Sequence, residues 1–296
     1  MTNEQRPRPT TVDTSDGLRL AVHERGDRSA PTVVLVHGYP DNHSVWDGVA
    51  AELASDFHVV AYDVRGSGAS GVPASRKAYR IDQLVDDLGR VIDAVSPDEP
   101  VHLVAHDWGS IQVWDGLTAG RLGPRIRTFT SISGPSLDHA AAWLRDSGVA
   151  KGPRLKQLLA SYYVFFFMTP LLPELSARRG IIDRLAHHSA AADTAAAVAP
   201  ATERGPAETV NGIQLYRANF PSRMLRPKPP KIDLPVQVIA PENDHHVSAP
   251  LQAGAPASYV RDLTVHHVPG SHWVVSQRPA LIAGLVREFT AEKVSA

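Results

Sequence analysis

The chain has 296 residues, enough for one large α/β domain with an inserted region or for two domains. Its 30 basic and 31 acidic residues give a formal net charge of -1, which argues against nucleic acid or an anionic membrane as partner and favours a small neutral substrate. Cysteine is absent, which excludes disulfides and thiolate sites, so a zinc site would have to use histidines and carboxylates.

The first half of the chain alternates short apolar runs with helical patterns, which predicts a mostly parallel sheet covered by helices. Residues 18–24 are typical of an early edge strand. The continuous apolar runs Thr32–Val36 and His58–Tyr62 predict buried strands that end in glycine-containing loops. Apolar residues of Ile81–Val95 recur at helical spacing and predict a crossover helix. The run Val101–Ala105 predicts the next strand.

In the second half, a helix over Ile111–Leu117 and a strand over Ile126–Ser133 come first, and then the pattern changes. The region that follows is alanine-rich and helical, contains prolines and has no convincing strand, which predicts a helical cap. Strands return at Pro235–Ala240 and Leu263–Val268, before a final helix over Ala280–Phe289. The expected organisation is core, cap and core, over residues 1–136, 137–222 and 223–296.

Two stretches of the cap region are expected to be irregular. Residues 189–206 have the weakest helical pattern and are interpreted as a loop. Residues 221–235 are proline-rich and basic, which favours a semi-rigid connection back to the core.

Neither the start of the chain nor its most apolar segment indicates a membrane anchor. Met1–Thr11 is polar and proline-rich with no apolar stretch behind it, unlike a secretory signal, so a cytoplasmic location is expected. Tyr162–Leu172 is interrupted by Thr169 and Pro170 and has about half the length that a membrane span requires. We interpret it as a buried or cavity-lining helix.

Asp107 stands between a predicted strand and a predicted helix, in the segment Val104–Gly109. A sharp turn of small residues in that position exposes a nucleophile at the top of a sheet. A carboxylate that attacks an alkyl carbon leaves an ester, which water can cleave, whereas a serine would leave an ether. The residue type therefore points to epoxides or alkyl halides. Taken alone, Asp107 could equally be the N-cap of the helix.

Hydrolysis of such an ester needs a base, and histidine has the pKa for this near neutral pH. His272 follows the last predicted strand and should emerge at the same edge of the sheet as Asp107. Asp244, which follows the strand before it, is placed to orient the imidazole, and Glu242 is a weaker rival. Each acid could also be an ordinary turn or surface residue. Three candidates after three different strands are much less expected by chance than any one of them.

Backbone N–H groups could stabilise the oxyanion that forms during ester hydrolysis. We assign these donors to Trp108, directly after Asp107, and to Tyr39, in the loop His37–Pro40. The alternative is that this loop is a simple turn at the end of a strand.

Four motifs together resemble the α/β-hydrolase-fold epoxide hydrolases and their haloalkane dehalogenase relatives. Two differences are visible, since Ala105 stands where this group often has glycine and Tyr39 where phenylalanine is common. The resemblance implies a mostly parallel eight-stranded sheet with an inserted helical cap, and the chain order nucleophile, acid, histidine. The motifs are His37–Pro40, Asp63–Ser70, His106–Gly109 and Gly270–Trp273.

Cap tyrosines distinguish the two activities, because opening an epoxide generates an alkoxide that a phenol can protonate or hydrogen-bond. The segment Leu215–Phe220 resembles the one that holds an epoxide-polarising tyrosine in epoxide hydrolases, which makes Tyr216 a candidate. Tyr163 resembles the second such tyrosine, with its neighbour Tyr162 as the alternative. Aromatic residues at helical spacing in a cap often only pack, so both could be structural.

The sequence therefore predicts an epoxide hydrolase that converts a small apolar epoxide into a vicinal diol through an alkyl ester of Asp107. We expect no cofactor and no metal, because no histidine pair has the spacing of a helical zinc motif and residues 66–71 do not open a phosphate-binding turn. His37, Phe166 and Trp273 are expected to contact the substrate.

Two alternatives stay open at this point, and so does the choice between monomer and homodimer. One alternative is a haloalkane dehalogenase, which is weakened because Tyr39 stands where such enzymes usually have asparagine. The other is a protein of the same fold that binds a hydrophobic ligand without turning it over.

Overall fold

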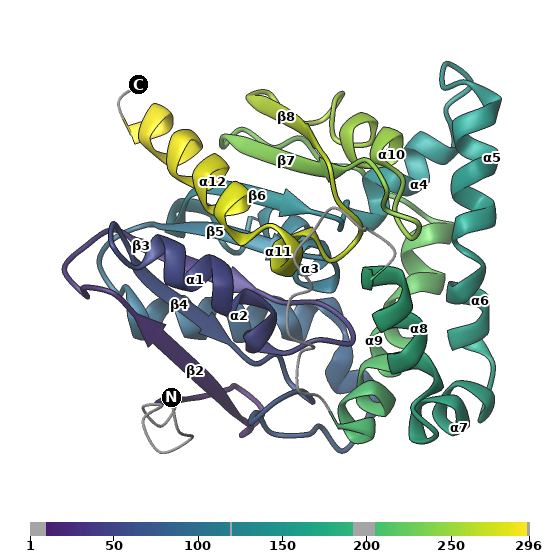
Figure 1. Cartoon of the computed structure of the whole chain (residues 1–296), viewed down its shortest axis with the longest axis horizontal. Coiled ribbons are helices and arrows are strands. Elements are labelled where there is room, and N and C mark those ends of the chain that lie inside the picture. Colours follow the sequence, from purple (N-terminus) through teal and green to yellow (C-terminus); the bar gives the residue numbers. More distant parts are fainter. Residues whose placement is uncertain (1–9, 119, 192–204, 295–296) are drawn as a thin grey trace.

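The computed structural model describes residues 10–118, 120–191 and 205–294, which are built around an eight-stranded sheet (Figure 1). The strands are β1 (Thr10–Asp13), β2 (Arg19–Arg25), β3 (Thr32–Val36), β4 (His58–Tyr62), β5 (Val101–His106), β6 (Ile126–Ile132), β7 (Val236–Pro241) and β8 (Leu263–Val268). Their spatial order is β1-β2-β4-β3-β5-β6-β7-β8. The pairs β1–β2 and β2–β4 are antiparallel and the other five pairs are parallel. The predicted mostly parallel sheet is confirmed.

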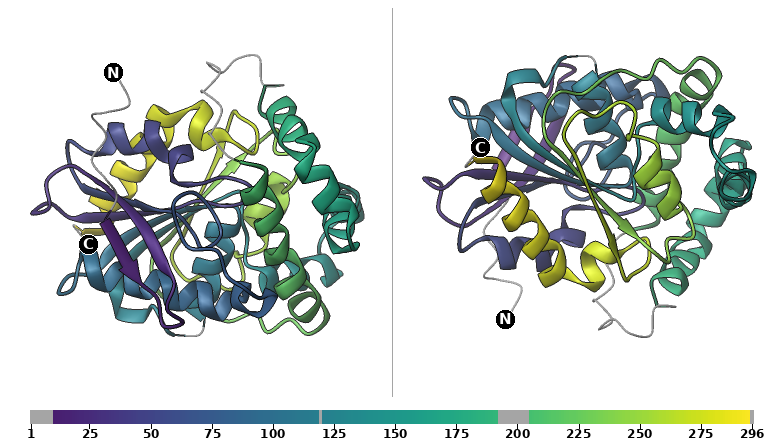
Figure 2. Two further views of the ribbon diagram at one scale, coloured as in Figure 1. Left: turned by 90° about the horizontal axis from the view of Figure 1, so that it is seen from below. Right: turned by 90° about the horizontal axis from the view of Figure 1, so that it is seen from above.

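Helices cover both faces of the sheet and the edge where its parallel strands end (Figure 1, Figure 2). They are α1 (Asp47–Leu53), α2 (Ile81–Val95), α3 (Trp108–Thr118), α4 (Leu137–Arg145), α5 (Lys151–Ala160), α6 (Tyr162–Met168), α7 (Leu172–Arg178), α8 (Ile181–Ala191), α9 (Pro206–Leu225), α10 (Ala249–Gly254), α11 (Val274–Gln277) and α12 (Pro279–Val294). Short 3-10 helices lie at His43–Trp46, Arg76–Tyr79 and Gly123–Arg125.

The continuous apolar run of β3 is explained by burial on both of its faces. Val34 and Val36 belong to a core cluster that includes residues of α2 and α3. Val33 and Leu35 point the other way, into a second cluster that includes residues of α1 and α12. All four side chains are fully buried, so alternation of polar and apolar residues, the usual mark of a half-exposed strand, is absent here.

Helices α4–α9 lie between β6 and β7 in the chain and form the predicted cap region (Figure 1). α9 is its central element, because it contacts α4, α6 and α7 as well as the 3-10 helix Arg76–Tyr79 of the core. α5, α6 and α7 lie on the outer side (Figure 1). Whether residues 137–222 form a unit of their own stays a prediction.

No single helix in the described ranges is long and apolar enough to cross a membrane. Lys151–Met168 and Leu172–Arg178 reach the required length and composition only as a pair, and the chain bends by 90° between them.

Two details differ from the expectations, the edge strand and the end of α9. The early strand is confirmed within one residue, but β1, a short and exposed strand without alternation, takes the edge position instead. The helix after Asp107 begins at Trp108, as the N-cap interpretation of Asp107 requires, and includes the expected segment Ile111–Leu117. α9 continues through Pro221 to Leu225, where the expected connection should have begun, because a proline near a helix end removes only one hydrogen bond. The expected loop over residues 189–206 lies mostly outside the described residues.

Candidate active site

Asp107 occupies a sharp turn between β5 and α3 with φ = 50°, a left-handed backbone conformation that few non-glycine residues adopt. The backbone packs so closely around this turn that two nearby positions, 109 and 134, have room only for glycine. A Cβ on Gly109 would lie 2.3 Å from the backbone oxygen of Val36, and one on Gly134 would lie 2.2 Å from that of Asp107. The Asp107 N–H donates to the Ile132 carbonyl at 3.0 Å, which ties the turn to β6. Backbone strain of this kind is typical of functional sites.

His272 lies between two carboxylates, each delivered by a different strand. Its Nδ1 is 3.0 Å from Oδ2 of Asp244, and its Nε2 is 3.7 Å from Oδ1 of Asp107. All three side chains are buried, with 4–7% of their surface exposed. The three candidates that the sequence placed after β5, β7 and β8 therefore meet, because the parallel strands end at one edge of the sheet.

Asp244, rather than Glu242, is the acid that contacts the imidazole, since Glu242 is exposed. Oδ1 of Asp244 accepts hydrogen bonds from the backbone N–H groups of His246 and Val247, at 2.8 and 2.9 Å. Oδ2 accepts from the Gln252 amide at 3.2 Å as well as facing His272. These bonds fix the carboxylate and favour the tautomer in which His272 carries its proton on Nδ1.

Burial and charge shift the pKa values of all three groups. Burial raises the pKa of Asp107 to about 6, against the opposing effect of the His272 charge and of backbone N–H donors. Burial also disfavours the charged forms of Asp244 and His272, but their mutual attraction and hydrogen bond outweigh it. The pKa of Asp244 falls to about 2 and that of His272 rises to about 9, to which the Asp107 charge contributes.

The two predicted oxyanion donors lie at the Asp107 carboxylate. The Tyr39 N–H donates to Oδ2 at 2.8 Å, and the Trp108 N–H is a second backbone donor to the same carboxylate. A Cβ on Gly38 would lie 2.5 Å from the Asp107 side chain, so this loop can approach only because position 38 is glycine. One oxygen of Asp107 is therefore held by the backbone, while Oδ1 faces His272.

A mostly apolar cavity lies over Asp107, between the sheet edge and the cap, and encloses about 570 Å³, counting the part open to solvent. Both predicted phenols line it, Tyr163 from α6 and Tyr216 from α9, with their ring centroids 6.1 Å apart. Tyr162 points elsewhere, with 71% of its surface exposed. Burial raises the pKa of both Tyr163 and Tyr216, and the Asp107 charge acts in the same direction, so the phenols keep their protons.

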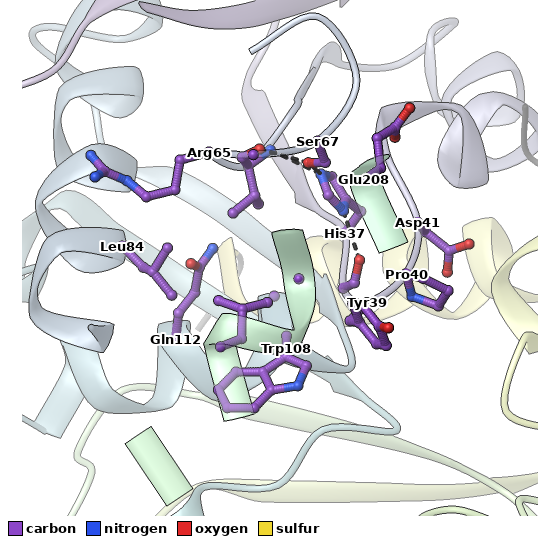
Figure 3. Close-up of a pocket in the computed structure, with 16 residues that line it drawn as sticks. His37, Tyr39, Pro40, Asp41, Arg65, Ser67, Leu84, Trp108, Gln112 and Glu208 are labelled. Carbon is purple, nitrogen blue, oxygen red and sulfur yellow. Dashed lines mark hydrogen bonds between the residues drawn. The ribbon is translucent and has the colours of Figure 1, made fainter. Parts of the chain in front are cut away.

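The three residues expected to contact substrate do not line this cavity. His37 lines a second cavity beside the loop after β4, where its Nε2 accepts from the Val64 N–H at 2.9 Å (Figure 3). Trp273 is buried and donates from Nε1 to Asp41 at 2.9 Å. Phe166 is half-buried against the core cluster. Their proposed contact with substrate stays a prediction, and the bonds of His37 and Trp273 give both a structural role.

His246 is a cavity residue that sequence reasoning did not single out. Its ring lies 5.0 Å from that of His272 and 5.3 Å from that of Tyr163. Burial, with the His272 charge second, lowers the pKa of His246 to about 4, so it is neutral beside His272. Its position two residues after Asp244 was the one available signal.

Among the described residues, one cluster has the ligand types of a metal site, and it lies outside the cavity. It consists of His23, His43 and Asp63. The two imidazole rings are stacked, with centroids 3.4 Å apart and planes within 10° of parallel. An ion in the plane of one ring would lie out of the plane of the other, so this arrangement does not suit shared coordination.

The geometry agrees with what the comparisons with known proteins show. Residues 31–279 match the family model described as "alpha/beta hydrolase fold". The chain belongs to this family. Among its relatives is "Probable oxidoreductase EphD" of Mycobacterium tuberculosis, 35% identical over 289 residues, which are 94% of this chain but 48% of that protein. The chain thus spans about half the length of this relative.

This α/β hydrolase is also similar to a second curated protein and to a solved structure, both named as epoxide hydrolases. "Epoxide hydrolase 3" of Mus musculus is 29% identical over 289 residues, covering 90% of this chain and 72% of that protein. The structure of an epoxide hydrolase from Bacillus megaterium with an inhibitor matches with a TM-score of 0.73 at 23% identity, over 95% of this chain and all of that one. At this identity the structural likeness establishes the fold.

Proposed function

We propose that this α/β hydrolase is an epoxide hydrolase that converts a small apolar epoxide into a vicinal diol. The observation that carries the proposal is the pair of protonated phenols, Tyr163 and Tyr216, lining the same buried cavity as Asp107. A nucleophilic carboxylate suits alkyl carbon, and phenols supply the proton that an epoxide oxygen needs and a halide does not. The relatives that bear the name epoxide hydrolase support the same activity.

In the first step, Oδ1 of Asp107 attacks a ring carbon and the carbon–oxygen bond of the epoxide breaks. The electron pair stays on the epoxide oxygen, which takes a proton from Tyr163 or Tyr216. Oδ2 of Asp107, held by the Tyr39 N–H at 2.8 Å, becomes the carbonyl oxygen of the ester. The carboxylate needs little reorganisation for this step, because the backbone already separates its attacking oxygen from its bound one.

In the second step, His272 removes a proton from water, and the resulting hydroxide attacks the carbonyl carbon of the ester. The negative charge develops on Oδ2, where the backbone N–H groups of Tyr39 and Trp108 stabilise it. Collapse breaks the bond to the diol, whose departing oxygen takes the proton from His272. It leaves Asp107 as a carboxylic acid, and the acid proton returns to the tyrosinate formed in the first step, so that the carboxylate and the phenol are both regenerated. Esterification has removed the Asp107 charge, which lowers the pKa of His272 and leaves more of it neutral and able to accept the proton.

A single turnover in heavy-oxygen water tests the covalent route. With enzyme in excess over epoxide, the label should enter Asp107 and be absent from the first diol formed, because water attacks the ester carbonyl. Label in the first diol would mean direct attack of water on the epoxide. Halide release from simple alkyl halides, without diol formation from epoxides, would instead identify a dehalogenase. A cytoplasmic location and the oligomeric state stay predictions.

A further inference from the structure

The outer side of the cap exposes an unusual number of large apolar side chains. Thirteen large hydrophobic residues of the described chain are exposed, and ten of them lie on or beside α5–α8, of which α5, α6 and α7 form the outer edge of the molecule (Figure 1). We call these ten the outer cap face. Scattered exposed apolar residues are normal, but a contiguous group marks an interaction surface. They are Leu155, Leu158, Leu159, Tyr162, Phe165, Leu171, Leu172, Leu175, Ile181 and Leu185.

The inner sides of α5 and α6 account for the buried residues of these helices, which leaves the outer face without a role in the core. Tyr163 and Val164 line the cavity over Asp107, and Gln157 donates to the His246 carbonyl at 3.0 Å. On the opposite side, Leu159 and Phe165 are 67% and 73% exposed. These side chains contribute nothing to folding, since they are exposed in the folded chain as in the unfolded one, and a group of this size marks a surface for interaction with another apolar phase.

Charge on the same segment indicates what that contact is. Residues 151–191 contain six Lys and Arg against two Asp and Glu, a net charge of +4, although the whole chain has -1. Both acids already have partners, since Glu174 pairs with Arg217 and Asp183 accepts from the Thr209 hydroxyl at 3.0 Å. A second copy of the chain on this face would bring like charges together. An anionic surface would be complementary to it.

We propose that the outer cap face docks on the surface of an anionic lipid bilayer. Its apolar side chains would enter the boundary between headgroups and acyl chains, while Lys151, Lys156 and the arginines of α7 and α8 contact lipid phosphates. The helices lie on the bilayer rather than cross it, since their other side forms the cavity wall. Docking would place that wall against the phase in which apolar molecules concentrate. The net charge of the whole chain does not indicate this surface, because the negative charge of the other residues outweighs the +4 of residues 151–191.

Vesicle flotation tests the proposal without any turnover, so its failure is separate from failure of the proposed activity. The full chain is mixed with vesicles of phosphatidylcholine alone, or with about one third phosphatidylglycerol, at low and high salt. We expect flotation with the anionic vesicles that falls as salt rises. The double variant Leu159→Glu/Phe165→Glu should bind at least about tenfold more weakly, and Lys151→Ala/Lys156→Ala about twentyfold, since each cation contributes a factor of about five.

Leu281→Glu is the matched control, because Leu281 is an exposed leucine on α12, away from the cap (Figure 1). It should bind vesicles like the parent chain, and all variants should keep the parent unfolding temperature. The proposal is overturned if the chain does not float, if neutral vesicles bind as well as anionic ones, or if Leu281→Glu weakens binding as much as the cap variants. It is also overturned if light scattering shows a dimer that Leu159→Glu/Phe165→Glu dissociates, since the face would then join two copies.

Discussion

The two walls of the cavity are held in place by different physical means. On the core side, Asp107 is fixed by a left-handed backbone turn, by glycines that admit no Cβ and by the Tyr39 N–H. On the cap side, Tyr216 is fixed mainly by ring packing, with Trp108 at 5.0 Å and Phe167 at 4.7 Å between centroids, and by a side-chain hydrogen bond with Trp108. A small change in the backbone of the core wall would displace the Asp107 carboxylate. Ring packing on the cap wall, by contrast, is kept when a tyrosine loses its hydroxyl.

This difference means that chemistry and structure can be separated more cleanly on the cap side. A substitution on the core wall changes a group that both reacts and accepts backbone hydrogen bonds. A Tyr→Phe substitution on the cap wall removes the reacting hydroxyl and leaves the packing ring. Variants of each wall therefore test this contrast.

The largest effect is expected from Asp107→Asn, which keeps an acceptor for the Tyr39 N–H but removes the nucleophile. Diol formation should fall by at least about 10⁴-fold, as for loss of other covalent nucleophiles. The unfolding temperature should stay the same or rise, because burial already disfavours the Asp107 charge. Steady-state assay and thermal unfolding measure the two effects. Retention of most of the activity would remove Asp107 from the mechanism.

Replacing His272 should separate the two chemical steps. We expect His272→Gln to form the ester but hydrolyse it about 10³-fold more slowly, because the base is lost while the nucleophile and phenols remain. Intact-mass spectrometry should then find the chain heavier by one substrate molecule. Failure to detect this adduct, together with lost turnover, would show that His272 is needed before the ester forms. The charge of Asp244 is left unpaired in this variant, so unfolding should be measured alongside.

The cap variants Tyr216→Phe and Tyr163→Phe should each lower the rate of ester formation by about 10- to 100-fold, and the double variant by more. One phenol can partly replace the other, so neither single change should abolish activity. The unfolding temperature should hardly move for Tyr163→Phe, because its ring stays packed, and should fall slightly for Tyr216→Phe, which also removes the hydrogen bond between the Tyr216 and Trp108 side chains. Tyr162→Phe is the matched control, since this residue is exposed, and it should leave the rate unchanged. A loss of stability without a loss of rate would mean that the phenols only pack.

The same contrast explains how much the sequence could predict. Thr32–Val36 and Ile81–Val95 were predicted to the residue, because a doubly buried strand and a long amphipathic helix leave strong patterns. The meeting of Asp107 and His272 followed from strands that end at one edge of the sheet.

Other features depend on packing that no local pattern encodes. Whether Tyr162 or Tyr163 faces the cavity depends on the rotation of α6 against α9. The sequence of so short a helix does not show this rotation. His246 enters the cavity because its N–H bonds to Asp244, a tertiary contact.

The smallest predicted effect, and the one that sharpens the comparison most, is in the pH dependence of the two steps. Asp107 must be ionised to attack, and burial raises its pKa to about 6, so ester formation should fall as pH drops through about 6. Ester hydrolysis needs neutral His272, whose pKa of about 9 in the free enzyme owes part of its elevation to the Asp107 charge.

That charge is absent in the ester, so hydrolysis should stay fast at pH values well below 9 and fall only in more acid solution. Asp244→Asn should shift this fall further toward acid pH, because the Asp244 charge and hydrogen bond are the main causes of the raised His272 pKa. Rapid-mixing measurements of ester formation and decay across pH would follow the two steps separately. A hydrolysis rate that declines as soon as pH falls below about 9 would mean that the Asp107 charge does not contribute to the raised pKa of His272.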